Sequence, residues 1–154
     1  MQHPSAYVAE HGDKHALVMG TSGQTLTYRE LEDASNRVAQ LLRARGLRTG
    51  DRIAVLLVNG PPWYEVVWGA LRAGLYVTPV NFGLTAAEAG YIVADCGAAA
   101  LVADAGLAET VAGMGADLDG VGTRLAVGGD LSGFEPYAEA VAAMPAARIA
   151  DEWE

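Results

Sequence analysis

Lysine and basic charge are scarce in this 154-residue sequence. Lys14 is the single lysine, and ten basic residues stand against nineteen acidic ones, which gives a formal net charge of −9. Nucleic acids and anionic membranes are bound by basic faces, so the composition argues against either as the main partner. A reaction that needs a lysine would have to use Lys14 or a segment outside this sequence.

Cysteine and long apolar runs are also scarce. Cys96 is the only cysteine, so an internal disulfide is excluded, and the sequence favours a reducing, cytoplasmic setting. We predict that Cys96 is a small core residue. The sequence contains no apolar run long enough to span a bilayer and no N-terminal basic-plus-apolar signal, so we expect no integral membrane segment. Abundant alanine and glycine with little lysine favour a bacterial source.

The residues that are present predict one α/β domain. Hydrophobic residues make up 51% of the chain, enough for a sizeable core. A polar start (1–13), expected to be an arm or a short helix, is followed by a β-hairpin around Gly20–Gly23. Helices and strands then alternate, which predicts a mostly parallel sheet with helices on both faces. We expect strands at 52–58, 75–80, 98–103 and 124–127, and a polar, extended tail from 146 to 154.

Three capping boxes and one turn set the expected helix ends. Thr27–Glu30, Thr85–Glu88 and Ser132–Glu135 each have a hydroxyl residue followed three positions later by glutamate, the pattern that begins a helix. The helices they predict run to Gly46, to about Asp95 and through Ala143, and a further helix is expected at 107–114. Another begins at Pro61-Pro62 and ends at Gly74, and the strand that follows contains Pro79, which cannot continue an ordinary ladder.

Several motifs suggest chemistry, but each has a stronger structural interpretation. Gly20-Thr21-Ser22-Gly23 resembles a phosphate loop, yet it leads into a strand and no lysine follows, which favours a hairpin turn. Gly113-Met114-Gly115 is a partial dinucleotide fingerprint that follows a helix instead of a strand.

Side chains that could bind a metal or line a tunnel are also better explained by structure. His11 and His15 are spaced like metal ligands, but no third ligand is evident, so we expect solvated histidines. Acidic residues are predicted to lie on solvated faces. Trp63 is expected in the core, and Trp68 either in the core or at an interface or acyl tunnel.

Four segments in order resemble a known family. They are TLTYREL (25–31), GDRIAVLLVN (50–59), GALRAGLYVTPVN (69–81) and LTAAEAGYIVADCGAAALVAD (84–104). Together they resemble the N-terminal part of the acyl-CoA synthetases, in the AMP-forming adenylating enzyme superfamily, with TYREL as its first core motif and LRAGLYVTPVN as its second. The TPVN ending favours acyl-CoA ligases over amino-acid adenylation domains.

The resemblance implies a two-step reaction of a larger enzyme. A carboxylate attacks the α-phosphate of ATP with Mg²⁺ present, and the thiol of coenzyme A then displaces AMP. Such enzymes use a Ser/Thr/Gly-rich phosphate loop with a lysine, later motifs, and a C-terminal lid that carries a second lysine. Lys14 precedes TYREL and matches neither lysine. Residues 1–154 are therefore expected to be a single N-terminal subdomain, without catalytic, cofactor-binding or metal-binding residues of its own.

The sequence departs from the family pattern at one position, and it also suggests which partners to expect. Many CoA ligases have an arginine that can reach a CoA phosphate after the second motif, and Gly83 stands at that position here. We expect an inactive fragment of an acyl-CoA ligase of fatty-acid or related metabolism, partnered by the remainder of its parent enzyme. The alternative is a stand-alone, non-catalytic interaction or dimerisation module. In either case an exposed apolar face is expected to cause self-association. An ordinary dinucleotide-binding domain lacks support because its glycine fingerprint is missing.

Overall fold

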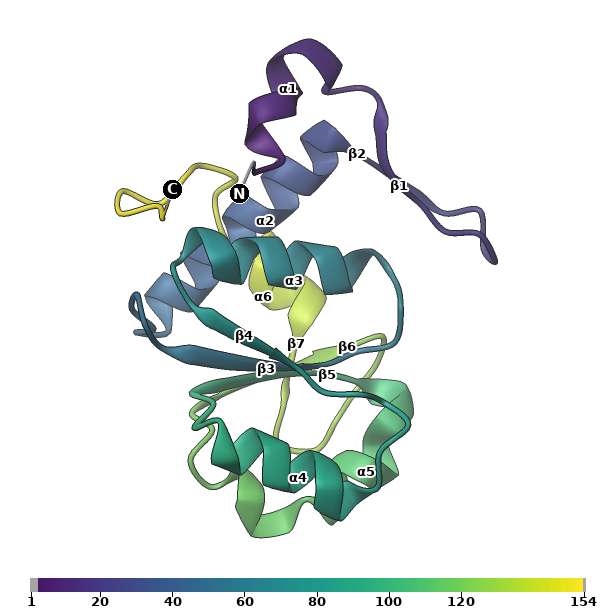
Figure 1. Ribbon diagram of the computed structural model, residues 1–154, viewed down its shortest axis with the longest axis vertical. Helices are drawn as coiled ribbons and strands as arrows, with labels where there is room; N and C mark the ends of the chain where they lie inside the picture. The colour runs from purple at the N-terminus through teal and green to yellow at the C-terminus, as the bar shows by residue number, and fades with distance from the viewer. Residues whose placement is uncertain (1–2, 154) are drawn as a thin grey trace.

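The computed structural model describes residues 3–153 (Figure 1). A short helix and an antiparallel strand pair come first: α1 (Ser5–His11), β1 (His15–Val18) and β2 (Thr25–Thr27). The α/β unit then contains α2 (Tyr28–Ala44), β3 (Arg52–Leu56), α3 (Pro61–Arg72), β4 (Tyr76–Pro79), α4 (Ala86–Asp95), β5 (Ala100–Asp104), α5 (Ala108–Gly113), β6 (Thr123–Val127), β7 (Glu135–Pro136) and α6 (Tyr137–Ala142). Two 3₁₀ turns, η1 (Ala105–Leu107) and η2 (Gly115–Leu118), flank α5.

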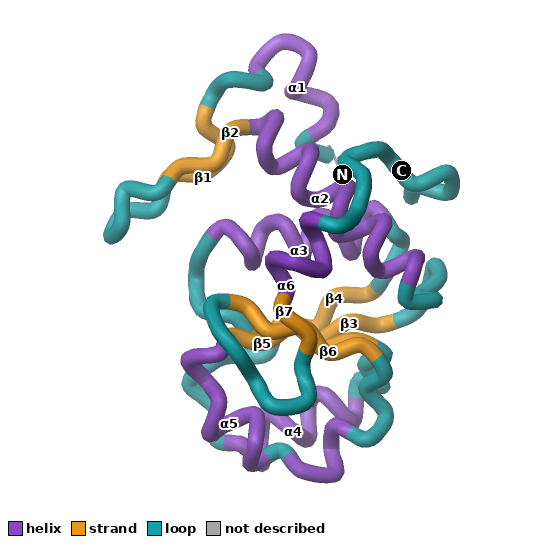
Figure 2. Tube along the Cα trace, turned by 180° about the vertical axis from the view of Figure 1, so that it is seen from behind, coloured by secondary structure: helices purple, strands orange, loops and turns teal. Residues whose placement is uncertain are grey.

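The sheet is parallel throughout, with strand order β4-β3-β5-β6-β7. Helices α2, α3 and α6 cover one face and α4 and α5 the other (Figures 1 and 2). The side chains of β3 show why both faces must be covered. Ile53 and Val55 enter the core under α2 and α3, whereas Ala54 and Leu56 enter the core over α4 and α5. The predicted α/β fold with a preceding hairpin is confirmed.

Two of the three predicted capping boxes are confirmed. The Thr27 hydroxyl accepts the Glu30 N–H at 3.2 Å, and the Glu30 carboxylate accepts the Thr27 N–H at 2.8 Å. Thr85 and Glu88 make the same reciprocal pair at the start of α4. These bonds satisfy backbone donors that have no partner inside the helix.

The third predicted box is wrong. After Ser132 the chain turns at Gly133, which has a φ of +78°, and Glu135 becomes the first residue of β7. The Glu135 carboxylate pairs with Arg45 instead of capping a helix, and α6 begins only at Tyr137, with no side-chain cap. Pairing with β6 and the ion pair thus outweigh the local pattern.

The end of α3 and the following strand agree with the prediction and refine it. Gly74 has a φ of +66°, and the N–H groups of Gly74 and Leu75 donate to Leu71 and Ala70, which closes the helix. Pro79 does pair in parallel register, opposite Val55. It is tolerated because β4 is an edge strand: the neighbouring Val80 N–H donates to β3, so the Pro79 nitrogen faces away from the sheet.

The chain ends are docked on the α/β unit. The N-terminal segment predicted as an arm or a short helix contains the helix α1. Residues 1 and 2 of this segment lie outside the described part. The tail expected to be polar and extended instead packs on α2 and α3 and has a turn near 150. The backbone oxygens of Ala146 and Ala147 accept side-chain bonds from α2, Trp153 N–H donates to the Arg72 carbonyl at 2.7 Å, and Ile149 is buried. Among residues 3–153, no helix combines the length and hydropathy that a bilayer crossing requires.

Candidate functional site

A cavity of about 920 Å³ lies at the carboxyl end of β6, which we call the carboxyl-end cavity. Its walls come from Arg37 of α2, the N-terminal part of α3, the end of β6 with the loop 128–130, and α6. In open parallel sheets, ligands bind outside the carboxyl ends of the strands. This cavity is therefore where the fold itself places a candidate binding site.

The half-buried Glu65 and the buried Tyr137 form a polar pair in the carboxyl-end cavity. The Tyr137 hydroxyl donates to the Glu65 carboxylate at 2.8 Å, which joins α6 to α3. Burial raises the pKa of Glu65, and the hydrogen bond from Tyr137 opposes this rise only in part. Burial, followed by the neighbouring carboxylate, raises the pKa of Tyr137 well above its ordinary value. At neutral pH the phenol is a hydrogen-bond donor, so the pair is suited to orienting polar groups and holding two helices together.

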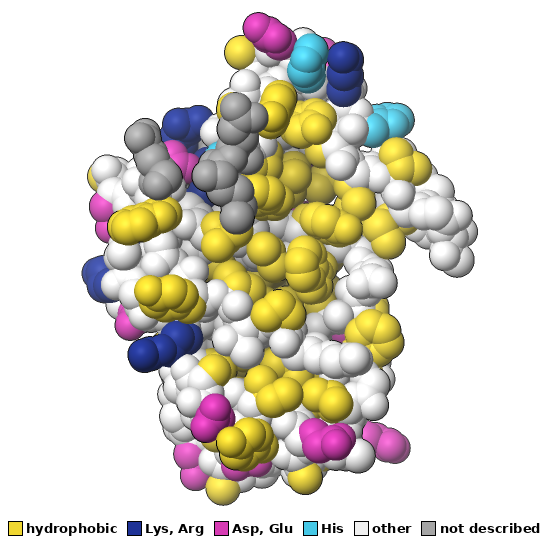
Figure 3. Space-filling view, in the orientation of Figure 1, with side chains coloured by type: hydrophobic (Ala, Val, Ile, Leu, Met, Phe, Trp, Pro, Cys, Tyr) yellow, Lys and Arg dark blue, Asp and Glu magenta, His cyan; other side chains and the backbone are white. Residues whose placement is uncertain are grey.

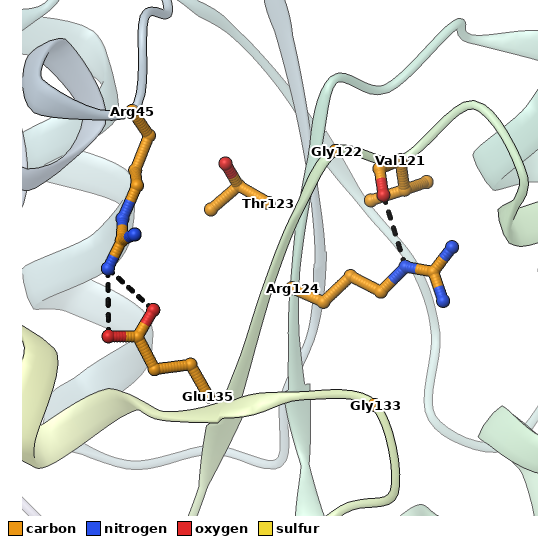
Figure 4. Close-up of a pocket in the computed structure, with 7 residues that line it drawn as sticks. All are labelled: Arg45, Val121, Gly122, Thr123, Arg124, Gly133 and Glu135. Atoms are coloured by element: carbon orange, nitrogen blue, oxygen red, sulfur yellow. Dashed lines mark hydrogen bonds and ion pairs between the residues drawn. The ribbon is translucent and has the colours of Figure 1, made fainter.

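A second pocket, of about 410 Å³, lies at the opposite, amino end of β6 (Figure 4). Arg45 and Glu135 face each other across it, with Arg45 Nη2 at 2.6 and 2.8 Å from the two carboxylate oxygens. Thr123 and Arg124 are adjacent in a strand and so point to opposite faces. Arg124 turns away and donates to the backbone oxygens of Val121 and Leu118. Each arginine already has partners within the chain, so this pocket is an ion-paired junction of α2, β6 and β7.

The glycine motifs do not form ligand sites. Gly20–Gly23 forms the end of the β1–β2 hairpin, where the Gly23 N–H donates to Met19 and the Met19 N–H donates to Gln24, both at 2.8 Å. The hairpin interpretation is confirmed. Gly113 ends α5 and Gly115 begins η2, so this motif lacks the strand-to-helix setting of a dinucleotide fingerprint.

His11 and His15 lie at the end of α1 and the start of β1, with the exposed Lys14 between them. The described part of the chain contains no group of three His, Cys, Asp or Glu side chains that could hold a metal ion. The two histidines therefore have no third ligand among the described residues, and no catalytic step is assigned to them.

The other residues singled out from the sequence are Cys96, Trp63, Trp68 and Gly83. Cys96 is half-buried against the α4 and α5 side of the core, with its Sγ 3.4 Å from the Val93 carbonyl oxygen. Trp63 packs against the core under α2 and α3, whereas Trp68 is half-buried and meets His3 edge-on at a centroid distance of 5.1 Å. Gly83 lies in an exposed turn where its N–H donates to Asn81 Oδ1 at 2.8 Å.

The largest polar cluster was missed by the sequence interpretation. Arg72, on α3, is fully buried, and its guanidinium contacts Ser35 and Asn36 on α2, Glu152 of the tail at 2.7 Å, and Glu32. The prediction that acidic residues lie on solvated faces is therefore wrong for Glu32. A signal was available: Glu32, Ser35 and Asn36 share one side of α2 at helical spacing, next to its apolar stripe.

His3 completes this cluster from the N-terminal end. Its Nδ1 lies 3.0 Å from Arg72 Nη2, and its Nε2 is buried without a hydrogen-bond partner. Burial, and then the Arg72 charge, lower the pKa of His3 to about 4. The imidazole is therefore neutral at pH 7, and it serves as an acceptor for the arginine. We call His3, Glu32, Ser35, Asn36, Arg72 and Glu152 the Arg72 cluster.

Comparison with protein families gives the assignment. Residues 5–146 match the model of a family described as "AMP-binding enzyme". The chain belongs to this family. The resemblance to acyl-CoA synthetases drawn from the sequence motifs is thus confirmed, because a fatty acid ligase and a feruloyl-CoA synthase are among the proteins that match this chain.

Two relatives show how the match is distributed. The fatty acid–[acyl-carrier-protein] ligase ScoC of Streptomyces coeruleorubidus is 39% identical over 93 residues, which is 60% of this chain and 18% of that protein. A feruloyl-CoA synthase of an Amycolatopsis species is 40% identical over 84 residues, 54% of this chain and 17% of that protein. The aligned region is thus less than a fifth of the length of either relative.

Solved structures agree on the fold. The N-terminal domain of FACL13 from Mycobacterium tuberculosis superposes with a TM-score of 0.84 at 23% identity, covering 97% of this chain and 38% of that one. A benzoate CoA ligase from Burkholderia xenovorans gives 0.78 at 26% identity, covering 97% and 30%. The described α/β unit is therefore the beginning of the N-terminal domain fold of the AMP-binding family.

Proposed function

We propose that this chain is the N-terminal portion of an ATP-dependent, AMP-forming acyl-CoA ligase. Such an enzyme joins a carboxylate to the α-phosphate of ATP with release of pyrophosphate, and then transfers the acyl group to the thiol of coenzyme A with release of AMP. The observation that carries this proposal is the continuous family match over residues 5–146. The fold likeness to an N-terminal domain of a fatty acyl-CoA ligase supports it.

The substrate class we propose is an acyl or aryl carboxylic acid. The relatives include a fatty acid ligase and a feruloyl-CoA synthase, which use acids of these two kinds by name. Gly83 has no side chain to reach a phosphate, so a contact of coenzyme A at this position would have to come from the backbone. We further propose a cytoplasmic setting, with the remainder of the ligase as the principal partner.

By itself, we expect the 154-residue chain to be inactive. Adenylation needs hydrogen-bond donors to the phosphates and a positive charge that stabilises the negative charge of the transition state. The only lysine, Lys14, is exposed beside the hairpin, and it lies outside the carboxyl-end cavity. ATP, magnesium and coenzyme A are therefore assigned to the longer enzyme.

ATP–pyrophosphate exchange tests the proposal. The purified chain should give no exchange with fatty or hydroxycinnamic acids, while a full-length 4-coumarate–CoA ligase assayed in parallel should do so with coumarate. Exchange by the 154-residue chain would show that it carries its own adenylation site. The coding sequence past codon 154 supplies a second test, because a Ser/Thr/Gly-rich loop with a lysine is expected in frame.

A stand-alone interaction module is the second candidate function. It is favoured by one observation, the uncharged outer side of α3, where Tyr64, Val67, Trp68 and Leu71 are half-buried. It predicts a stop codon directly after residue 154.

A further inference from the structure

The two ends of the described chain dock next to α2 with little apolar packing (Figures 1 and 2). Helix α1, at one end, contains no buried residue, although the Tyr7 ring lies 5.7 Å from that of Tyr28. The tail from 146 to 153 has no helix or strand and one buried residue, Ile149. In Figure 3 acidic and basic side chains lie together beside the chain ends, whereas the neighbouring face is mostly hydrophobic. Polar contacts are therefore the principal restraint on both ends.

The polar contacts of the two ends meet on one guanidinium. At the N-terminal end, His3 Nδ1 lies 3.0 Å from Arg72 Nη2. At the other end, Arg72 Nη1 donates to the Glu152 carboxylate at 2.7 Å, and the Trp153 N–H donates to the Arg72 carbonyl at 2.7 Å. His3 and Glu152 thus use different nitrogens of the same side chain. Because Arg72 is fully buried, the two ends exclude water from it together.

Glu32 connects the two ends by a second route. Its carboxylate contacts Arg72, and it also lies 3.9 Å from His3 Nδ1 and 3.6 Å from Arg148 of the tail. Arg148 in turn lies 3.5 Å from Glu152. The N-terminal segment, α2, α3 and the tail are therefore joined in one polar network.

We infer that Arg72 is a latch that couples the docking of α1 to the docking of the tail, so that loosening one chain end loosens the other. The physical reason is desolvation. Each docked end excludes water from the guanidinium, and a hydrogen bond is stronger where the local dielectric is low. Each end thus strengthens the bond that holds the other. The inference goes beyond the proposed ligase function and does not rest on it, because every contact of the latch lies within residues 3–153.

Backbone N–H groups at both ends report docking separately. A helix of seven residues is not stable by itself, so the amides of α1 should lose protection when α1 undocks. The Trp153 amide should lose protection when the tail undocks, because its acceptor is the Arg72 carbonyl. Native-state hydrogen exchange followed by NMR measures these amides one by one. Amides of the central strand β5 exchange only through larger openings, so they report global stability in the same sample.

One substitution at each end tests the coupling at the opposite end. Glu152→Ala should speed hydrogen exchange of the α1 amides about 5- to 10-fold. His3→Phe keeps a ring against Trp68 but removes the acceptor, and it should speed exchange of the Trp153 amide by a similar factor, because coupling between two sites is reciprocal. Glu152→Gln keeps an acceptor for the guanidinium, so its effect on α1 should be smaller than that of Glu152→Ala.

Asp151→Ala and Asp13→Ala are the matched controls. Asp151 lies in the tail and pairs with Arg43 at 3.1 Å, whereas Asp13 follows α1 and pairs with Arg29 at 3.5 Å. Neither aspartate belongs to the Arg72 cluster. Each control should therefore leave hydrogen exchange at the opposite chain end unchanged.

Two results would overturn the latch. The first is faster hydrogen exchange only at the chain end that carries the substitution, and the second is an equal acceleration at the opposite end and in β5, which would indicate global destabilisation alone. The double variant His3→Phe/Glu152→Ala adds an independent reading from urea unfolding. Coupled ends predict that it loses less stability than the two single variants together, whereas strict additivity would contradict the inference.

Discussion

Replacing Arg72 should cost more stability than any other single polar substitution in the chain. The guanidinium is fully buried and faces two carboxylates, Glu32 and Glu152, whose side chains are 11% and 17% exposed. Arg72→Met keeps most of the volume but leaves both carboxylates with only the exposed Arg148 as a counter-charge, at 3.6 Å from Glu32 and 3.5 Å from Glu152. Breaking a buried pair in this way costs about 3–5 kcal/mol, and we expect about 3–4 kcal/mol because both carboxylates retain some contact with water.

A double-mutant cycle separates the charge effect from the loss of packing. Glu32→Gln in the Arg72→Met background removes one of the stranded charges while keeping a hydrogen-bonding side chain. If the ion pair dominates, the double variant should be more stable than the sum of the two single changes predicts, with a coupling energy of about 2 kcal/mol.

Urea unfolding followed by circular dichroism measures all four proteins under identical conditions. The free energies of unfolding should be compared at unchanged m-values, because a change in m would indicate a different denatured or native state. Asp151→Asn is the control, since Asp151 pairs with Arg43 at an exposed position and should matter little. A loss below about 1 kcal/mol for Arg72→Met, or strict additivity in the cycle, would refute the reasoning.

Three further predictions follow from local geometry and can be checked by the same unfolding measurements. Gly69→Ala should destabilise by about 1–3 kcal/mol, because a Cβ there would lie 2.5 Å from Val38 Cβ and 2.9 Å from the Ser35 carbonyl oxygen; an unchanged midpoint would show that α2 and α3 can separate freely. Thr27→Ala and Thr85→Ala should each cost about 1 kcal/mol through loss of the cap, whereas Ser132→Ala, at the pattern that caps no helix, should be silent. The pKa of His3 is about 4 in the folded chain against 6.5 ordinarily, so unfolding takes up a proton between these values. The resulting stabilisation should be complete above pH 6.5 and should decline by about 1–2 kcal/mol, allowing for solvent screening, as the pH falls towards 4, a slope that His3→Gln should flatten.

The order and type of the elements could be predicted because they depend on local patterns. The run 52–58 is apolar at every position after Arg52, which indicated a strand buried on both faces, and β3 is such a strand. The turn at Gly74 could also be predicted, because it depends only on residues within one helical turn. The capping box predicted at Ser132–Glu135 is wrong for the opposite reason: the partner of Glu135 is Arg45, ninety residues earlier in the chain.

The polar contacts of the candidate site could not be predicted from one sequence. Glu65 and Tyr137 are 72 positions apart, and Arg72 meets Glu152 across 80. Neither pair has a spacing that a local pattern could reveal. Sequence reasoning therefore assigned these acids to solvated faces by default, and only the packing of α6 and the tail against α2 and α3 shows otherwise.

The Arg72 cluster also shows that the structural unit is longer than the segment the family match defines. The match covers residues 5–146, yet His3 precedes it and Glu152 follows it, and both contact the same buried guanidinium. Between them, Gln40 and Arg43 of α2 contact Ala147 and Asp151 of the tail. A chain cut at residue 146 would retain Glu32 but lose Glu152. This loss would be costly, because a buried arginine needs its carboxylate partners. Residues 147–153 therefore belong to the folded unit, and the boundaries of a variant made for biophysical work should include them.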